Sequence, residues 1–97
     1  MTQLAATLIT LFERSRLANE PKEYPVAGSI TVRVRYDPGG HRQLIAWRPN
    51  GQDIGELEIS KLAHDGGLGD DCTHETKARQ GITYHVLTAT TPEEIQP

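Results

Sequence analysis

The chain has 97 residues, of which 36% are hydrophobic and five are aromatic, so we expect a single domain, residues 1–97, with a thin core. Ten basic against 13 acidic residues give a net charge of −3, which argues against sequence-independent binding of nucleic acid. One cysteine, Cys72, excludes an internal disulfide and a cysteine-rich zinc site, and no apolar run is long enough to span a bilayer. No basic segment precedes the apolar residues 4–12 as an export signal would require, so we expect a cytoplasmic protein without a membrane partner.

Residues 2–18 have the pattern of an amphipathic helix. Their apolar residues recur at spacings of three and four, and Thr2 is placed to cap the first turn. The stripe is wide enough to cover one face of a sheet, and it comprises Leu4, Leu8, Leu11, Phe12 and Ser15. Two prolines between Asn19 and Pro25 break the helix, so we expect that segment to be a connection.

Residues 29–36 alternate apolar and polar side chains, as a half-buried strand does. The run Asp37-Pro38-Gly39-Gly40 that follows is typical of a three-residue hairpin loop, with proline at the first corner and Gly40 in the left-handed conformation. Asp37 then faces His41. The register that results pairs Val34 with Leu44, Arg33 with Ile45, Val32 with Ala46 and Thr31 with Trp47.

This hairpin leaves one alternative open. If residues 37–40 close as a two-residue loop, His41 pairs with Tyr36, and Ile45 and Trp47 move to the aliphatic face. We prefer the three-residue loop because it gathers the aliphatic residues of the strands on one side.

A second turn signal, Asn50-Gly51, is the best two-residue hairpin code and predicts a third strand that ends near Ser60. The three strands form a meander with two distinct faces. One face collects Ile30, Val32, Val34, Tyr36, Leu44, Ala46, Leu57 and Ile59. The other collects Thr31, Arg33, Arg35, Ile45, Trp47, Ile54, Glu56 and Glu58.

The last third of the chain has less periodicity. Residues 61–80 show none, so we expect a long functional or mobile loop, with a short helix over 73–80 as an alternative. Residues 81–88 alternate again and predict a final strand whose core-facing residues are Ile82, Tyr84 and Val86.

The predicted fold class is therefore α+β. An N-terminal helix packs on a three- to four-stranded antiparallel sheet in the order helix, β-meander, long loop, final strand. We expect the tail, residues 91–97, to be frayed.

The second face of the meander is the candidate binding surface, because tryptophan and arginine dominate binding hot spots. The predicted binding residues are Arg33, Arg35, Ile45, Trp47 and Ile54. A protein partner would bury them, as would a second copy in a homodimer. Two alternatives remain: other segments cover Trp47 and make it core, or the two arginines are a solvated face that stacks on Trp47.

Ligand-type residues are densest in the loop 61–80. His64, Asp70, Cys72 and His74 could supply ligands to zinc or iron, which is the metal-binding alternative. Their spacing is weakly specific, because Cys72 and His74 are two residues apart and no second CxxC or HxxxH pair exists. We therefore expect a glycine-rich acidic loop and no cofactor.

Covalent catalysis has little support. Cys72 could pair with His64, His74 or His85, but no nucleophile elbow is present, so we expect no enzyme activity. A sheet with several arginines and an aromatic residue could also bind nucleic acid, but the glutamates predicted on the adjoining strand count against it.

No motif resembles those of a known family. The sequence predicts a small binding or regulatory protein that acts by occupying a macromolecular surface. Small acidic single domains without catalytic motifs are typical of phage or mobile-element accessory proteins that inhibit a host machine, including anti-CRISPR-type inhibitors. The assignment to a phage or mobile element rests on an analogy of composition alone. The alternatives are a metal-binding protein or small metalloenzyme that uses the 64–75 loop, and a sheet-based nucleic-acid binder.

Overall fold

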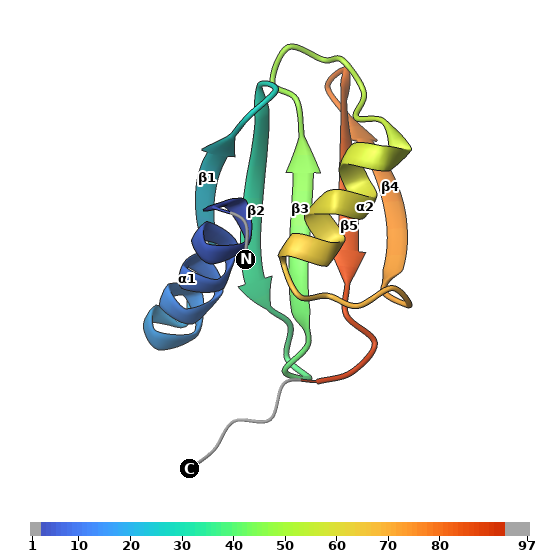
Figure 1. Ribbon diagram of the computed structural model, residues 1–97. Coiled ribbons are helices and arrows are strands. Elements are labelled where there is room, and N and C mark those ends of the chain that lie inside the picture. Colours follow the sequence, from blue (N-terminus) through green and yellow to red (C-terminus); the bar gives the residue numbers. More distant parts are fainter. Residues whose placement is uncertain (1–2, 93–97) are drawn as a thin grey trace.

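The computed structural model describes residues 3–92, which form two helices and one five-stranded antiparallel sheet (Figure 1). The elements follow in the order α1 (Gln3–Ala18), β1 (Lys22–Val26), β2 (Ile30–Tyr36), β3 (Arg42–Trp47), α2 (Glu56–Asp65), β4 (Thr73–Arg79) and β5 (Ile82–Thr88). In space the strand order is β1-β2-β3-β5-β4, so α2 carries the chain past β5 to the far edge of the sheet. The predicted α+β class is confirmed, and the strands number five rather than three to four. Neither described helix has the length and apolar character needed to cross a membrane.

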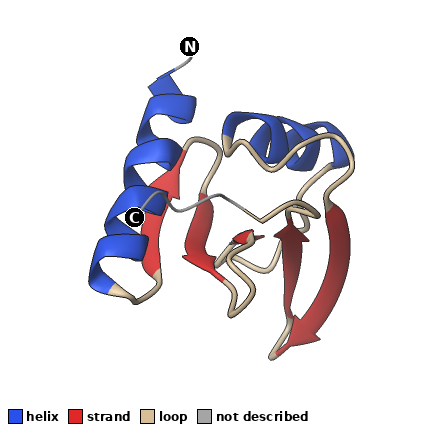
Figure 2. Cartoon of the chain, turned by 90° about the horizontal axis from the view of Figure 1, so that it is seen from below, coloured by secondary structure: helices blue, strands red, loops and turns tan. Residues whose placement is uncertain are grey.

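Both helices cover the same face of the sheet. α1 packs against β1 and β2, and α2 crosses over the half formed by β3, β5 and β4 (Figures 1 and 2). The core lies between this helical layer and the sheet. Its fully buried large side chains are Leu8, Phe12, Val32, Val34, Leu44 and Leu87.

Helix α1 buries the stripe that its sequence predicts. Leu8 and Phe12 have no exposed surface, and Leu11 and Ser15 are buried beside them. The Ser15 hydroxyl donates to the carbonyl oxygen of Glu20 at 2.7 Å, which satisfies this buried polar group and holds the turn after the helix. The predicted cap, Thr2, lies outside the described residues.

The hairpin between β2 and β3 closes with the predicted three-residue loop. The N–H of Asp37 donates to the carbonyl oxygen of His41 at 2.9 Å, and Gly40 is left-handed with a φ of 83°. The Asp37 carboxylate accepts from two N–H groups of the loop, those of Gly39 and His41, both at 2.9 Å. The two-residue alternative is wrong. The register is the predicted one, with Thr31 opposite Trp47, Val32 opposite Ala46, Arg33 opposite Ile45 and Val34 opposite Leu44.

The third predicted strand, after Asn50-Gly51, is wrong, because the turn forms one residue earlier than expected. The Gly51 N–H donates to the carbonyl oxygen of Arg48 at 3.0 Å, which puts Pro49 at the first corner. Gly51 has a positive φ but Asn50 does not, so the two left-handed residues of a type I′ hairpin are missing. The chain leaves the sheet here and continues into α2.

The α2 segment has a helix signal that its strand-like alternation concealed. Two acidic residues in its first turn, Glu56 and Glu58, suit the positive end of the helix dipole. Leu57, predicted to be core, is 88% exposed. Ile59 is buried as predicted, but it reaches the core as a residue of helix α2 and not of a strand. The faces expected for a third strand, which put Ile54 with Trp47 and Leu57 with Leu44, therefore do not form.

Two strands lie where connections were expected. β1 occupies most of the segment 19–25, because proline is tolerated on an edge strand and Pro25 lies on one. β4 occupies residues 73–79 of the expected loop 61–80, and the helix alternative for 73–80 is wrong. All β4 residues are exposed, so alternation could not reveal the strand. β4 is positioned by its pairing with β5 across a two-residue turn, Gln80-Gly81, with φ of 53° and 79°.

β5 is a strand as predicted, but it faces the opposite way. His85 and Leu87 point to the helices, while Ile82, Tyr84 and Val86 do not, because β3 pairs Leu44 with Leu87 and Ile45 with Val86. Most of the tail predicted to fray, residues 93–97, lies outside the described residues.

Helix α2 can be distinguished from the predicted strand by one pair of substitutions. Leu57→Ala should change the free energy of unfolding by less than about 0.5 kcal/mol, because the side chain is on the surface. Ile59→Ala should cost about 2–4 kcal/mol, because it leaves a cavity in the core. Urea unfolding measures both. Similar losses at the two positions would contradict the helix, since the predicted strand buried both side chains.

Candidate functional site

The sheet face opposite the helices, here called the open face, carries side chains from every strand. Its central positions are Arg33 and Arg35 on β2, Gln43, Ile45 and Trp47 on β3, Tyr84 and Val86 on β5, and Glu75, Lys77 and Arg79 on β4. A hollow of about 560 Å³ lies on this face. Its floor is apolar and aromatic, and cations border it from the β2 side and from the β4 side.

Four of the five predicted binding residues lie together on the open face. Strand pairing places Arg33 beside Ile45, and Arg35, Ile45 and Trp47 line the same hollow. Ile54 is not with them: it is 4% exposed and belongs to the core under the helices. It was assigned to the face on the assumption of a third strand that does not form.

Trp47 is more buried than a free binding anchor would be, with 9% of its surface exposed. The Tyr84 ring packs against it at a centroid distance of 5.2 Å, and the Arg33 guanidinium carbon lies 5.5 Å from its ring centre. Part of each alternative raised for Trp47 is therefore present: the final strand covers its ring through Tyr84, and one of the two arginines, Arg33, lies over it. Trp47 and the neighbouring Val86 are buried outside the main core cluster, so they form the base of the open face.

The charge of the open face differs from the prediction. Glu56 and Glu58, expected on the same face as the arginines, are on α2, where Glu58 pairs with Arg48 at 2.7 Å. β4 places Lys77 and Arg79 on the open face instead. The open face thus carries four cations and two carboxylates, Glu23 and Glu75, in a chain whose net charge is −3.

Two of these cations are held in place by neighbours. Arg33 donates to the Glu23 carboxylate with Nε at 2.8 Å and also with a terminal nitrogen, and the bond fixes the guanidinium over Trp47. Arg35 donates to the side-chain oxygen of Gln43 at 2.5 Å. Within residues 3–92, Lys77 and Arg79 have no such carboxylate partner and are exposed.

Sequence reasoning missed Tyr84, Lys77 and Arg79 as members of this face. A signal for them exists, because Gln80-Gly81 separates two seven-residue segments as a two-residue hairpin turn does. The polar segment 73–79 hid it, since an edge strand exposed on both sides shows no alternation.

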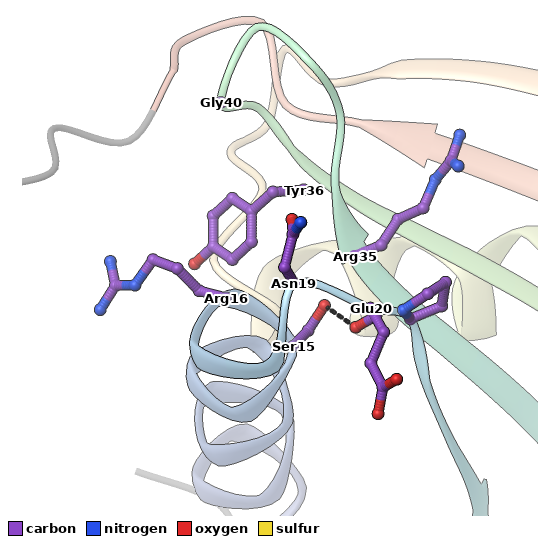
Figure 3. A pocket seen from close by; sticks show the side chains of 8 residues that line it. Ser15, Arg16, Asn19, Glu20, Arg35, Tyr36 and Gly40 are labelled. Carbon is purple, nitrogen blue, oxygen red and sulfur yellow. Dashed lines mark hydrogen bonds between the residues drawn. The ribbon is translucent and has the colours of Figure 1, made fainter.

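A second hollow, of about 390 Å³, lies between the end of α1 and β2 (Figure 3). Its charged side chains do not converge: the ends of Arg16, Glu20 and Arg35 point in different directions around Tyr36. The hydrogen bond from Ser15 to the Glu20 carbonyl oxygen closes the turn beside it. This hollow results from the helix-to-strand connection and offers no arranged set of polar groups.

Two histidines and an aspartate form a chain of hydrogen bonds on the helix side of the sheet. His74 Nε2 and His85 Nδ1 are 2.8 Å apart, and His85 Nε2 lies 2.6 Å from an oxygen of Asp53. The hydrogen bond from His85 lowers the pKa of Asp53 below its ordinary value, and the N–H of Ile54 adds to this effect. The chain ties the segment before α2 to β5 and β4.

The four residues of the metal-binding alternative line one small hollow of about 220 Å³ without forming a ligand set. His64, Asp70, Cys72 and His74 all border it, yet His74 is engaged by His85. Within residues 3–92 no group of three histidine, cysteine or carboxylate side chains is arranged to hold a metal ion.

Cys72 is not prepared as a nucleophile. Burial raises the pKa of its thiol, and the nearby carboxylates of Asp71 and Asp70 raise it further. Because the thiolate is the reactive form, this environment opposes covalent catalysis at Cys72.

Comparison with protein families, with curated proteins and with solved structures gives no match for this chain. Its function is therefore argued from the geometry of the open face.

The bond between Asp53 and His85 predicts a specific pH dependence of stability. A carboxylate whose pKa is lowered by folding stabilises the protein above its unfolded pKa of about 3.9, and this stabilisation is lost as the pH falls through the folded pKa. Asp53→Asn should therefore be less stable than the wild type at neutral pH. The difference should shrink between about pH 5 and pH 2.

Thermal unfolding at a series of pH values measures this effect. Asp70→Asn removes an exposed loop carboxylate outside the histidine chain and is the matched control, which should keep the wild-type profile. Parallel profiles for the wild type and Asp53→Asn would show that the bond does not contribute.

Proposed function

We propose that the protein is a small binding protein whose open face docks on an acidic surface of a partner protein. One observation carries the proposal: four cations flank an apolar and aromatic floor on one face of a chain with net charge −3. A basic face on an acidic protein is a local feature and is not explained by composition. Complementary charge would steer an acidic partner to this face and fix its orientation.

The side chains of the open face would make two kinds of contact with a partner, ionic at the rim and apolar at the centre. Arg35, Lys77 and Arg79 are exposed and would form a cationic rim. Ile45 and Tyr84 are half-buried and offer apolar contact at the centre, while Trp47 supports them from below. Arg33 is already held by Glu23, so little side-chain entropy would be lost when it binds a carboxylate. An apolar centre with a charged rim is the usual anatomy of a protein interface.

The shape of the site favours a macromolecule over a small molecule. The hollow extends across four strands, from β2 to β4, and the charged side chains of Lys77 and Arg79 on its β4 side are exposed to solvent. Small-molecule sites are concave and surround most of the ligand with fixed groups. An inhibitory role, in which a phage or mobile-element protein occupies a host machine, stays a prediction from composition.

Single-stranded nucleic acid is the second candidate. It is favoured because the open face carries Lys77 and Arg79, and the glutamates predicted for this face lie on α2. Four cations and two aromatic residues on an antiparallel sheet are the elements that stack bases and contact phosphates. Base stacking needs a free ring face, however. The Trp47 ring is covered by Tyr84 and Arg33, and for this reason we rank the acidic protein surface first.

Polyglutamate and oligothymidylate are suitable probes for the two candidates. Trp47 is the single tryptophan of the chain and lies under the face, so its fluorescence reports occupancy directly. We expect polyglutamate to bind, with an affinity that falls as salt rises. Arg35→Glu combined with Arg79→Glu should weaken binding by at least about tenfold, which is about 1.4 kcal/mol.

The matched control combines Arg14→Glu with Lys61→Glu. These exposed cations lie on α1 and α2, and their reversal changes the net charge by the same amount. The control should retain wild-type affinity. Equal losses in the two double variants would contradict the proposal, because binding would then follow net charge. Tighter binding of oligothymidylate than of polyglutamate would replace the first candidate by the second.

A further inference from the structure

The two edge strands of the sheet, β1 and β4, differ in how well they are protected against pairing with a further strand. β1 is short and contains Pro25, which cannot donate to a further strand. β4 contains no proline, pairs with β5 without interruption from Thr73 to Arg79, and is exposed along its whole length. Within residues 3–92, β5 is the only strand that β4 pairs with. One row of β4 main-chain groups is thus available to another strand.

The turn between β4 and β5 identifies these main-chain groups. In a two-residue hairpin the residues that flank the turn, here Arg79 and Ile82, form a hydrogen-bonded pair, and such pairs alternate along the ladder. The main-chain groups of His74, Thr76 and Ala78 consequently point away from β5. A partner strand must match these three positions.

We infer that β4 pairs antiparallel with β4 of a second copy of the chain, with Thr76 on the two-fold axis. In this register all seven residues of the strand are paired, and the outward groups of His74 meet those of Ala78 in the other copy. Glu75 lies opposite Lys77 of the second copy, and the reciprocal pair repeats the contact. Opposite charges at directly facing positions stabilise antiparallel pairs.

Neighbouring registers are worse for the same side chains. If the axis passes through Glu75, the Glu75 side chains of the two copies face each other. If it passes through Lys77, the two Lys77 side chains face each other. Both arrangements are destabilising because like charges are directly opposite. Both shifts also leave residues at the strand ends unpaired. The charge pattern of β4 therefore selects one register of a second copy, which an unrelated extended peptide would have no reason to match.

The pairing would join two five-stranded sheets into one of ten strands. The two-fold axis between neighbouring antiparallel strands is perpendicular to the sheet, so the open faces of both copies lie on the same side. This inference rests on the β4 edge and does not depend on what the open face binds.

Charge reversal tests the inference on the full chain. Light scattering after size exclusion should give the wild type a mass twice the 10.7 kDa of one chain. Glu75→Lys and Lys77→Glu each place like charges at both facing positions, and each should weaken dimerisation by about tenfold or more. Circular dichroism should show that both variants remain folded, since the two side chains are exposed.

Two rescues are expected only if Glu75 faces Lys77 of the other copy. The double variant Glu75→Lys with Lys77→Glu restores opposite charges and should dimerise like the wild type. An equimolar mixture of the two single variants should form a mixed dimer, because a chain with two cations then faces a chain with two carboxylates.

Thr76→Pro tests the main-chain contact independently. It removes an outward N–H at the axis without removing a hydrogen bond to β5, so a folded monomer is expected. A monomeric wild type at micromolar concentrations would overturn the inference. A dimer whose mass is unchanged in Thr76→Pro and in both single charge variants would also overturn it, because the copies would then meet at another surface.

Discussion

The register between β2 and β3 is the constraint on which the rest of the structure depends. The loop at residues 37–40 fixes it, through the Asp37 carboxylate and the left-handed Gly40. A slip of one residue would turn Leu44 toward solvent and Ile45 under the helices. Because β5 pairs with β3, and β4 with β5, the register extends across the sheet and determines which side chains form the core and which form the open face.

Local turn chemistry allowed this half of the fold to be predicted from the sequence. The helix stripe on α1, the β2–β3 pairing and the shared face of Arg33, Ile45 and Trp47 all follow from periodicity and one loop. The other half depends on context. Pro49 displaced the second turn, and the segment after it satisfies both strand alternation and helical spacing.

β4 shows a different limit of sequence reasoning. Its residues bury nothing, so its conformation is set by pairing with β5 and not by its own pattern. Half of the cations of the open face, Lys77 and Arg79, come from this strand. The predicted face was therefore correct for Arg33, Arg35, Ile45 and Trp47, but it included Ile54 and missed Tyr84. Its charge was also wrong, since it had two glutamates on this face and neither Lys77 nor Arg79.

The same strand connects the surface features of the molecule. Its side chains Lys77 and Arg79 border the open face, its outer edge is available for a second copy, and His74 joins it through His85 to Asp53 before α2.

The central claim is that the open face is the binding surface. The most direct measurement is a titration of isotope-labelled protein with polyglutamate, followed by NMR at each backbone amide. We predict shifts at Arg33, Ile45, Lys77 and Tyr84, with the amides of α1 and α2 unchanged. Shifts confined to the helices, or spread evenly over the exposed lysines and arginines, would contradict the account.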